Sequence, residues 1–344
     1  MTQSDVETLT KQILDSIDRE REREIISRRY GLYDRKETLE QIGELLGITR
    51  ERVRQLEKAT MTRLRMNGEA GELETLKSFE ATLLQTVKDN GGVARVTKLA
   101  EVLTGEAGNK INQARISFIS DLCPSLSVIN DNDNFYQSVA VTKLHDDKKV
   151  AKLVQSIVDS LKKIGEPSDI ETVAKAAGIS DPAHAEALAS TSKNLATLNG
   201  KWGLIKWPTV NPKNIRDKIY VILQQNGKHM HFSEIADAIK ASDFKRKDVT
   251  TQAIHNELIK DKRFVLIGRG IYALKEWGYK KGTVADIITE VLKEAKEPLH
   301  RDEIVKRVLK SRYVKETTIL LNLQGKSQFQ RVSKATYALA DSAE

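Results

Sequence analysis

Two helix-start signals and one helix-stop signal lie close together near the N-terminus. Thr38 precedes Gln41 at the spacing of a capping box, in which the hydroxyl accepts a hydrogen bond from the backbone N–H of the third helical residue. Gly47 supplies the backbone freedom that ends a helix, and Thr49 can then cap a second one. The segment therefore predicts two short helices joined by a tight turn, which is a helix-turn-helix.

Each predicted helix has one apolar face, because its apolar residues recur at three- and four-residue intervals. In the first helix they are Leu39, Ile42, Leu45 and Leu46, and in the second Val53, Leu56, Thr60 and Leu64. We expect these two faces to pack together. The other face of the second helix then presents Glu51, Arg54, Gln55 and Lys58, with Arg50 at its entrance.

The residue types on that outer face are those that read base edges in the major groove. Arginine (Arg50, Arg54) pairs with guanine, glutamine (Gln55) with adenine, and a carboxylate (Glu51) accepts from cytosine. Glu51 has a second interpretation, because a carboxylate in the first turn also favours the positive end of the helix dipole. The spacing alone favours neither interpretation.

The positive charge of the chain is concentrated locally. Overall, 56 Lys and Arg stand against 48 Asp and Glu, a net charge of +8. Residues 21–65 carry 12 basic against 8 acidic residues, and residues 209–281 carry 15 against 8. Because a polyanion responds to local charge, both segments are candidates for nucleic-acid binding.

A loose internal repeat of roughly sixty to seventy residues follows the N-terminal unit. Each copy has an amphipathic helix, a Gly- or Pro-marked turn, two further helices and two short strands around a polar turn, the order of a winged helix. The predicted modules are 76–143, 148–208, 213–278 and 282–340, with breaks at 66–69, 145–147, 208–212 and 278–282. The predicted fold class is mainly α, with a helix-turn-helix at 1–66 followed by tandem winged-helix domains with small β-hairpin wings.

The third module carries most of the positive charge and offers secondary DNA contacts. Its predicted contact residues are Lys245, Arg246 and Lys247 before the third helix, Thr251, Gln252, His255 and Asn256 on it, and Arg269 at the wing tip. Such contacts give salt-sensitive affinity for any sequence, although a solvated charged face is the alternative for any one lysine. Lys315, Thr318 and Asn322 occupy comparable positions in the fourth module. The near-neutral first two modules suit protein docking better.

Several function classes are not supported by the composition. Cys123 is the single cysteine, so disulfides and a thiolate zinc site are not expected. The six histidines form no nucleophile and base arrangement, and we expect neither an enzyme nor a metal, cofactor or small-molecule site. No run of eighteen apolar residues and no signal peptide is present, so we expect a cytoplasmic, nucleoid-associated protein without a membrane partner.

The sequence from Thr38 to Glu57 closely resembles the helix-turn-helix of domain 4 in sigma-70 family transcription initiation factors, and Arg21–Leu32 resembles the helix before it. The resemblance covers residues 21–65. It implies that Arg50, Glu51, Arg54 and Gln55 contact bases of the minus-35 promoter element, and it favours the base-reading interpretation of Glu51. It also implies that Arg21 and Arg29 hold phosphates, to which we add Lys58, and that RNA polymerase is contacted through the flap of its beta subunit.

The chain also departs from that family. Sigma factors carry a promoter-melting domain, rich in exposed aromatics, ahead of domain 4. Here 20 residues precede Arg21, and aromatic residues make up 5% of the chain. We therefore expect a protein that recruits or positions polymerase and is not a complete sigma factor.

The third module resembles the HARE-HTH domain, a winged helix shared by the delta subunit of bacterial RNA polymerase and by chromatin or DNA-modification proteins. The resemblance rests on Phe232–Ala236, Phe264 and Gly270–Leu274. The leading hypothesis is a transcription regulator of a bacterium or bacterial virus. The alternatives are an architectural nucleoid protein and the DNA-recognition subunit of a modification or restriction system.

Overall fold

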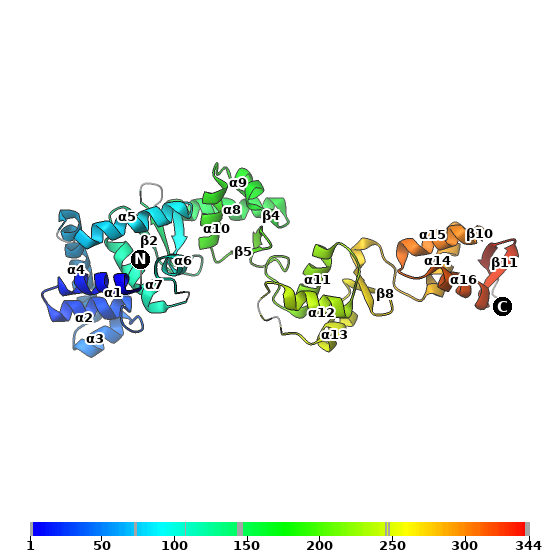
Figure 1. The fold of residues 1–344 in the computed structure, drawn as a ribbon, viewed down its shortest axis with the longest axis horizontal. Coiled ribbons are helices and arrows are strands. Elements are labelled where there is room, and N and C mark those ends of the chain that lie inside the picture. The colour runs from blue at the N-terminus through cyan, green and yellow to red at the C-terminus, as the bar shows by residue number, and fades with distance from the viewer. Residues whose placement is uncertain are drawn as a thin grey trace. The chain divides into compact units, whose positions relative to one another are not determined.

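The chain divides into two compact units, Met1–Lys206 and Trp207–Glu344, in a computed structural model (Figure 1). The structure describes residues 3–71, 74–106, 108–142, 147–244, 246 and 248–340. Both units are mainly helical and carry small three-stranded antiparallel sheets. This confirms the mainly α part of the predicted fold class. Within these ranges, no helix has the length and apolarity needed to cross a bilayer.

The first unit opens with four helices, and the predicted cap signals are confirmed. The helices are α1 (Gln3–Asp15), α2 (Glu20–Tyr30), α3 (Leu39–Leu46) and α4 (Arg50–Ala70). Thr38 forms the capping box with Gln41, and the Thr49 side chain accepts from the backbone N–H of Arg52. Gly47 ends α3 in the left-handed region at φ 64°. Local hydrogen bonds therefore fix both ends of the turn.

The predicted break at 66–69 is wrong, because α4 runs through it and ends at Gly71, where φ is 84°. Gly68 lies inside the helix. A Cβ atom at Gly68 would lie 3.0 Å from Cδ2 of Leu76, so this glycine allows the next helix to approach closely. The glycine marks a packing contact and not the end of a helix.

The core of the helix-turn-helix is formed by one buried residue from each of three helices, Ile25, Ile42 and Val53. Around it pack the partly buried side chains of Leu39, Leu46, Ile48 and Leu56. The prediction that Leu45 faces this core is wrong, since its side chain is 55% exposed. The buried stripe of α3 follows residues 39, 42 and 46, and position 45 lies outside it.

A buried carboxylate ties α2 to α4. Glu22 accepts a hydrogen bond from Arg63 Nη2 at 2.7 Å and one from Arg19 Nη1 at 3.2 Å. Burial alone would raise the pKa of Glu22, but the hydrogen bonds and charges of Arg63 and Arg19 outweigh it, and the pKa is lowered from 4.5. The folded state therefore favours the ionised carboxylate.

The free energy of unfolding is expected to decrease as the pH is lowered through the range where Glu22 becomes protonated. The contribution is complete above the ordinary pKa of 4.5 and is lost as the pH falls through the lower folded pKa. Glu22→Gln cannot titrate, so its free energy of unfolding should decrease less steeply than that of the wild type over this range. Urea denaturation from about pH 7 to about pH 3 measures both slopes. Equal slopes would show that Glu22 is not linked to folding.

The rest of the chain repeats the order helix, strand, helix, helix, strand, strand four times. In the first unit the elements are α5 (Glu74–Asp89), β1 (Val93–Arg95), α6 (Val96–Thr104), α7 (Lys110–Leu122), β2 (Leu126–Ile129) and β3 (Ser138–Val141), then α8 (Asp147–Ile164), β4 (Ser168–Asp169), α9 (Ile170–Ala177), α10 (Pro182–Thr191), β5 (Leu195–Leu198) and β6 (Lys201–Leu204). In the second unit they are α11 (Ile215–Asn226), β7 (Met230–His231), α12 (Phe232–Ala241), α13 (Thr251–Lys260), β8 (Phe264–Gly268) and β9 (Ile271–Leu274), followed by a 3-10 turn at Lys275–Trp277, then α14 (Val284–Ala295), β10 (Leu299–His300), α15 (Arg301–Ser311), α16 (Glu316–Gly325), β11 (Phe329–Ser333) and β12 (Thr336–Leu339).

In each of the four sheets the last strand lies in the centre and pairs antiparallel with the other two. Met230 pairs with Tyr272 in the third repeat, and Leu299 pairs with Tyr337 in the fourth. The first strand of each sheet is not predicted from the sequence, because it is only two or three residues long and too short to show alternation.

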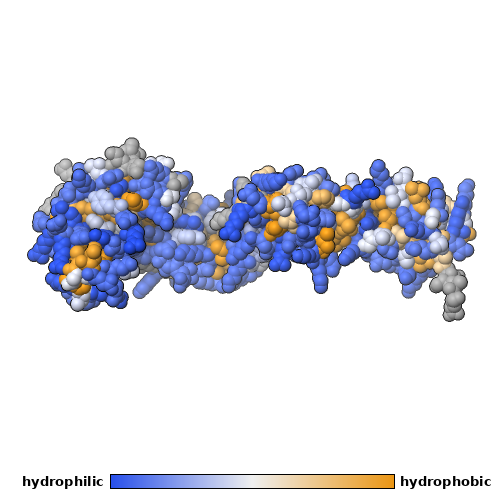
Figure 2. Space-filling view, turned by 90° about the horizontal axis from the view of Figure 1, so that it is seen from below, coloured by the Kyte–Doolittle hydropathy of each residue, from blue (hydrophilic) through white to orange (hydrophobic). Residues whose placement is uncertain are grey.

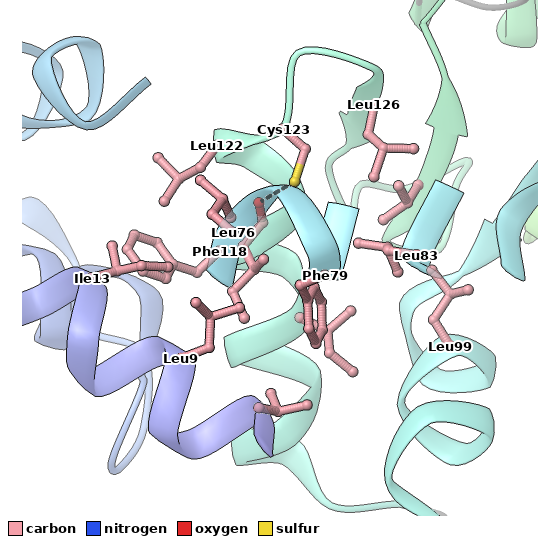
Figure 3. Packing of buried hydrophobic residues seen from close by; sticks show 14 of the residues in the cluster. Leu9, Ile13, Leu76, Phe79, Leu83, Leu99, Phe118, Leu122, Cys123 and Leu126 are labelled. Atoms are coloured by element: carbon pink, nitrogen blue, oxygen red, sulfur yellow. Dashed lines mark hydrogen bonds between the residues drawn. The ribbon is translucent and has the colours of Figure 1, made fainter. Parts of the chain in front are cut away.

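One continuous core joins the N-terminal helices to the first repeat (Figure 3). Leu9 and Ile13 of α1 lie in the same cluster as Phe118 of α7 and Phe79 of α5. Cys123 is buried here and its thiol donates to the carbonyl of Ile119 at 3.2 Å. Burial raises the pKa of that thiol, which fits an inert packing role. The predicted domains 1–66 and 76–143 are therefore not separated by distinct cores.

Candidate nucleic-acid interface

All the residues predicted to read bases lie exposed on the outer side of α4. Val53 is fully buried against α2 and α3, and this contact turns the opposite face of the helix outward. That face carries Arg50, Glu51, Arg54, Gln55 and Lys58, and none of these side chains is buried. We call this set the α4 face.

An ion pair orders the centre of the α4 face. Arg54 donates to both carboxylate oxygens of Glu51, from Nη2 at 2.6 Å and from Nε at 2.8 Å. Gln55 Nε2 lies 3.4 Å from the same carboxylate, and Arg52 Nη1 donates to Gln55 Oε1 at 3.3 Å. The hydrogen bond from Arg54 is the main cause that lowers the pKa of Glu51. Since exposed pairs add little stability, the network chiefly orients these side chains.

The residues assigned to phosphates differ in their surroundings. Arg21 donates to the carbonyl of Leu46 at the end of α3. Arg29 donates to Glu57 of α4 and to the carbonyl of Glu37, each at 3.3 Å. Lys58 is exposed and forms no ion pair with any residue the structure describes. Arg21 and Arg29 therefore already form hydrogen bonds that stabilise the helix-turn-helix. Lys58 could bind a phosphate without losing an existing ion pair.

Gly43 sets the distance between α3 and the turn that leads to α4. A Cβ atom there would lie 2.7 Å from the carbonyl oxygen of Ile48, a backbone atom that cannot move alone. We expect Gly43→Ala to lower the free energy of unfolding by about 1–3 kcal/mol through overpacking. Thermal melting monitored by circular dichroism measures the effect. Glu44→Ala, one position along on the exposed side, is the matched control, and equal melting temperatures for the two variants would contradict the close approach.

The third helix of the first repeat, α7, is buried by the N-terminal helices. Tyr30 Oη donates to Asp121 Oδ2 at 2.6 Å, and Arg65 Nη2 of α4 donates to Oδ1 of the same residue at 2.7 Å. Arg115 is 5% exposed and pairs with Glu7 of α1 at 3.0 Å. In a DNA-binding winged helix this is the helix that would enter the groove. Here it anchors the helix-turn-helix.

The third helix of the second repeat, α10, packs against the first repeat. A Cβ atom at Gly91 would lie 2.6 Å from the carbonyl oxygen of Ala183, so the two backbones are in close contact. The Tyr136 N–H donates to the carbonyl of Thr191 at 2.8 Å, and the Arg95 guanidinium donates to that of Ser190. Both third helices of the first unit are thus used for contacts within the chain.

In the third repeat, α13 is more open. Gln252 and Asn256 are exposed, and Gln252 Nε2 donates to Asn256 Oδ1 at 3.1 Å. Thr251 and His255 are half-buried, and the His255 ring packs edge-on against Phe232 with centroids 5.1 Å apart. The other predicted contacts are Arg246 and Arg269, which are exposed, and Lys245 and Lys247, which lie outside the described residues.

In the fourth repeat two of the three predicted positions are less accessible than Gln252 and Asn256 of the third. Thr318 and Asn322 are half-buried, and Asn322 Nδ2 donates to the carbonyl of Thr318 at 2.8 Å. Each is the neighbour of a buried residue, Ile319 or Leu323, and these two residues determine which face of α16 is turned inward. The exposed position between them is Leu321, 68% accessible, which offers no hydrogen bond to a base. Lys315 remains exposed.

Residues 19–66 match the family Sigma-70, region 4. The RNA polymerase sigma factor SigA of Nostoc sp. is 46% identical over 56 residues, 16% of this chain and 14% of the relative. The principal sigma factor HrdC of Streptomyces coelicolor is 56% identical over 46 residues, 13% of this chain and 14% of the relative. SigA1 of Synechococcus elongatus is 52% identical over 46 residues, 13% of this chain and 12% of the relative.

The family match confirms a sigma-70 region 4 domain at residues 19–66, and it ends before the first repeat. The chain spans between 12% and 14% of the length of these relatives. No group of three or more His, Cys, Asp or Glu in the described ranges is placed to hold a metal ion.

Proposed function

We propose that this protein is a DNA-binding transcription regulator that reads promoter-like DNA of the minus-35 type with the α4 face. The observation that carries the proposal is a region 4 domain whose helix α4 presents Arg50, Glu51, Arg54 and Gln55 outward. The Glu51 carboxylate accepts hydrogen bonds from Arg54 and Gln55 and so orders the centre of this face. These groups match the donors and acceptors of guanine, adenine and cytosine in the major groove.

RNA polymerase is the proposed protein partner, through the flap of its beta subunit. The family resemblance supports this partner, and so does an apolar patch over α3, one of several in the view of Figure 2. Leu45 is the exposed apolar side chain of α3. We propose a recruiting or positioning role without catalysis.

We further propose that the four repeats are winged helices, the third of the HARE-HTH type. Their element order and the central last strand of each sheet support this assignment. Because α7 and α10 are covered, we assign DNA contacts among the repeats to the third. The contact residues among those described would be Arg246, Gln252, Asn256 and Arg269.

An architectural role is the second candidate, and the positive charge of residues 209–281 favours it. Co-purification with core polymerase, combined with footprinting on a minus-35 fragment and on its scrambled control, separates the two roles. A regulator should retain polymerase and protect the minus-35 element selectively. Equal protection of both fragments without bound polymerase would contradict the regulator and support the architectural role.

A further inference from the structure

A polar cavity of about 580 Å³ lies between the region 4 domain and the first repeat, inside the first unit. One wall is the end of α2 and the loop to α3, from Arg29 to Lys36. The other is α7, from Lys110 to Asp121, with Asn130 and Gln137 from the strand region. Its volume lies within the range of small-molecule sites, about 300–1,000 Å³.

Three exposed cations line this cavity without a direct ion pair in the described part of the chain. The side chains of Arg35, Lys36 and Lys110 form no hydrogen bond or ion pair with any residue the structure describes. The other charges are mostly neutralised, because Glu57 pairs with Arg29 and Asp121 pairs with Arg65. Only Asp34 remains as an unpaired carboxylate among the lining residues. The cavity thus has an excess of positive charge.

Charges of both signs act on the exposed Lys36 ammonium. Burial and the charge of Arg29 lower the pKa of Lys36, the charges of Glu57 and Asp131 raise it, and on balance the pKa is lowered from its ordinary value of 10.5. An anion beside this ammonium would favour its charged form. The neutral lining adds the side-chain amides of Gln113 and Asn130, which can bind uncharged polar groups.

We propose that this cavity binds a phosphorylated small molecule of nucleotide size, with its phosphate held by Arg35, Lys36 and Lys110. Lysine and arginine are the usual ligands of phosphate, and the remaining volume and amides would accommodate the polar body. Since the walls belong to both the region 4 domain and the first repeat, the ligand would contact both. The site needs no part of the α4 face and therefore does not depend on the proposed promoter reading.

Calorimetric titration of the full chain with adenosine and guanosine 5′-diphosphates, at fixed ionic strength, tests the proposal. We expect saturable binding at one site. Lys36→Gln and Lys110→Gln should each weaken it roughly tenfold. Lys88→Gln on α5, which lies outside the cavity, is the matched control and should bind as the wild type does. Both nucleotides failing to bind at about 1 mM would overturn the proposal.

Two further measurements keep the outcome unambiguous. Each variant is first required to melt as the wild type does, and Gln113→Ala, which keeps every charge, tests the same cavity independently. A duplex without a promoter element is then titrated against the nucleotide complex. If this duplex displaces the nucleotide, and Lys36→Gln weakens both, the cavity holds DNA backbone and the small-molecule proposal is wrong. Gln55→Ala should leave nucleotide binding unchanged, so failure of promoter reading is seen separately.

Discussion

Phe118→Ala is expected to lower the free energy of unfolding of the first unit by about 3–5 kcal/mol, as deletion of a large buried aromatic side chain does. Phe118 is fully buried in the middle of α7 and meets the ring of Tyr30 edge-on at 5.0 Å. The neighbours come from both α1 and α5, so no single helix can collapse into the space left behind. Urea denaturation of the full chain measures the loss.

The same variant tests whether the region 4 domain and the first repeat unfold together. Because one core joins them, binding to a minus-35 duplex should be lost at the same urea concentration as the helical signal. Val102→Ala on the exposed side of α6 is the control and should change stability by less than about 0.5 kcal/mol. DNA binding that survives after the repeat has unfolded would contradict the shared core.

The features that local chemistry determines could be predicted from the sequence. Thr38 and Thr49 act as caps and Gly47 ends α3, because each effect depends on neighbours within a few residues. The outward side of α4 also follows from the buried stripe through Val53. The region 4 match at 19–66 rests on this segment.

What the sequence could not provide depends on contacts between distant residues. The helical pattern at α7 is the same whether the helix enters DNA or packs against α1, and contacts such as that between Arg115 and Glu7 distinguish the two. Likewise, the residue types around Gly68 predict a break between domains, but Gly68 lies inside α4 and close to Leu76. The cavity is a third case, since Lys36 and Lys110 are far apart in sequence and lie together only after α7 docks.

Gln55→Ala is expected to reduce discrimination between a minus-35 duplex and its scrambled control by roughly 5- to 150-fold, the effect of losing a bidentate base contact of about 1–3 kcal/mol. Lys58→Ala on the same face should weaken both duplexes equally and reduce the salt slope of binding by about 1, because a phosphate contact carries no sequence information. Fluorescence anisotropy at several salt concentrations measures both quantities. Unchanged discrimination in Gln55→Ala would show that the α4 face does not read bases.

The pair Glu51 and Arg54 allows a sharper form of this test. Arg54 holds both oxygens of the Glu51 carboxylate, so either side chain alone loses the partner that orients it. Glu51→Ala and Arg54→Ala should therefore each reduce discrimination, and the double variant should be little worse than the poorer single one. Simple addition of the two losses would mean that each residue contacts its base independently. If Glu51 served only the helix dipole, Glu51→Ala would change the free energy of unfolding slightly and leave discrimination between the two duplexes intact. The dipole affects the stability of the helix and does not depend on the base sequence.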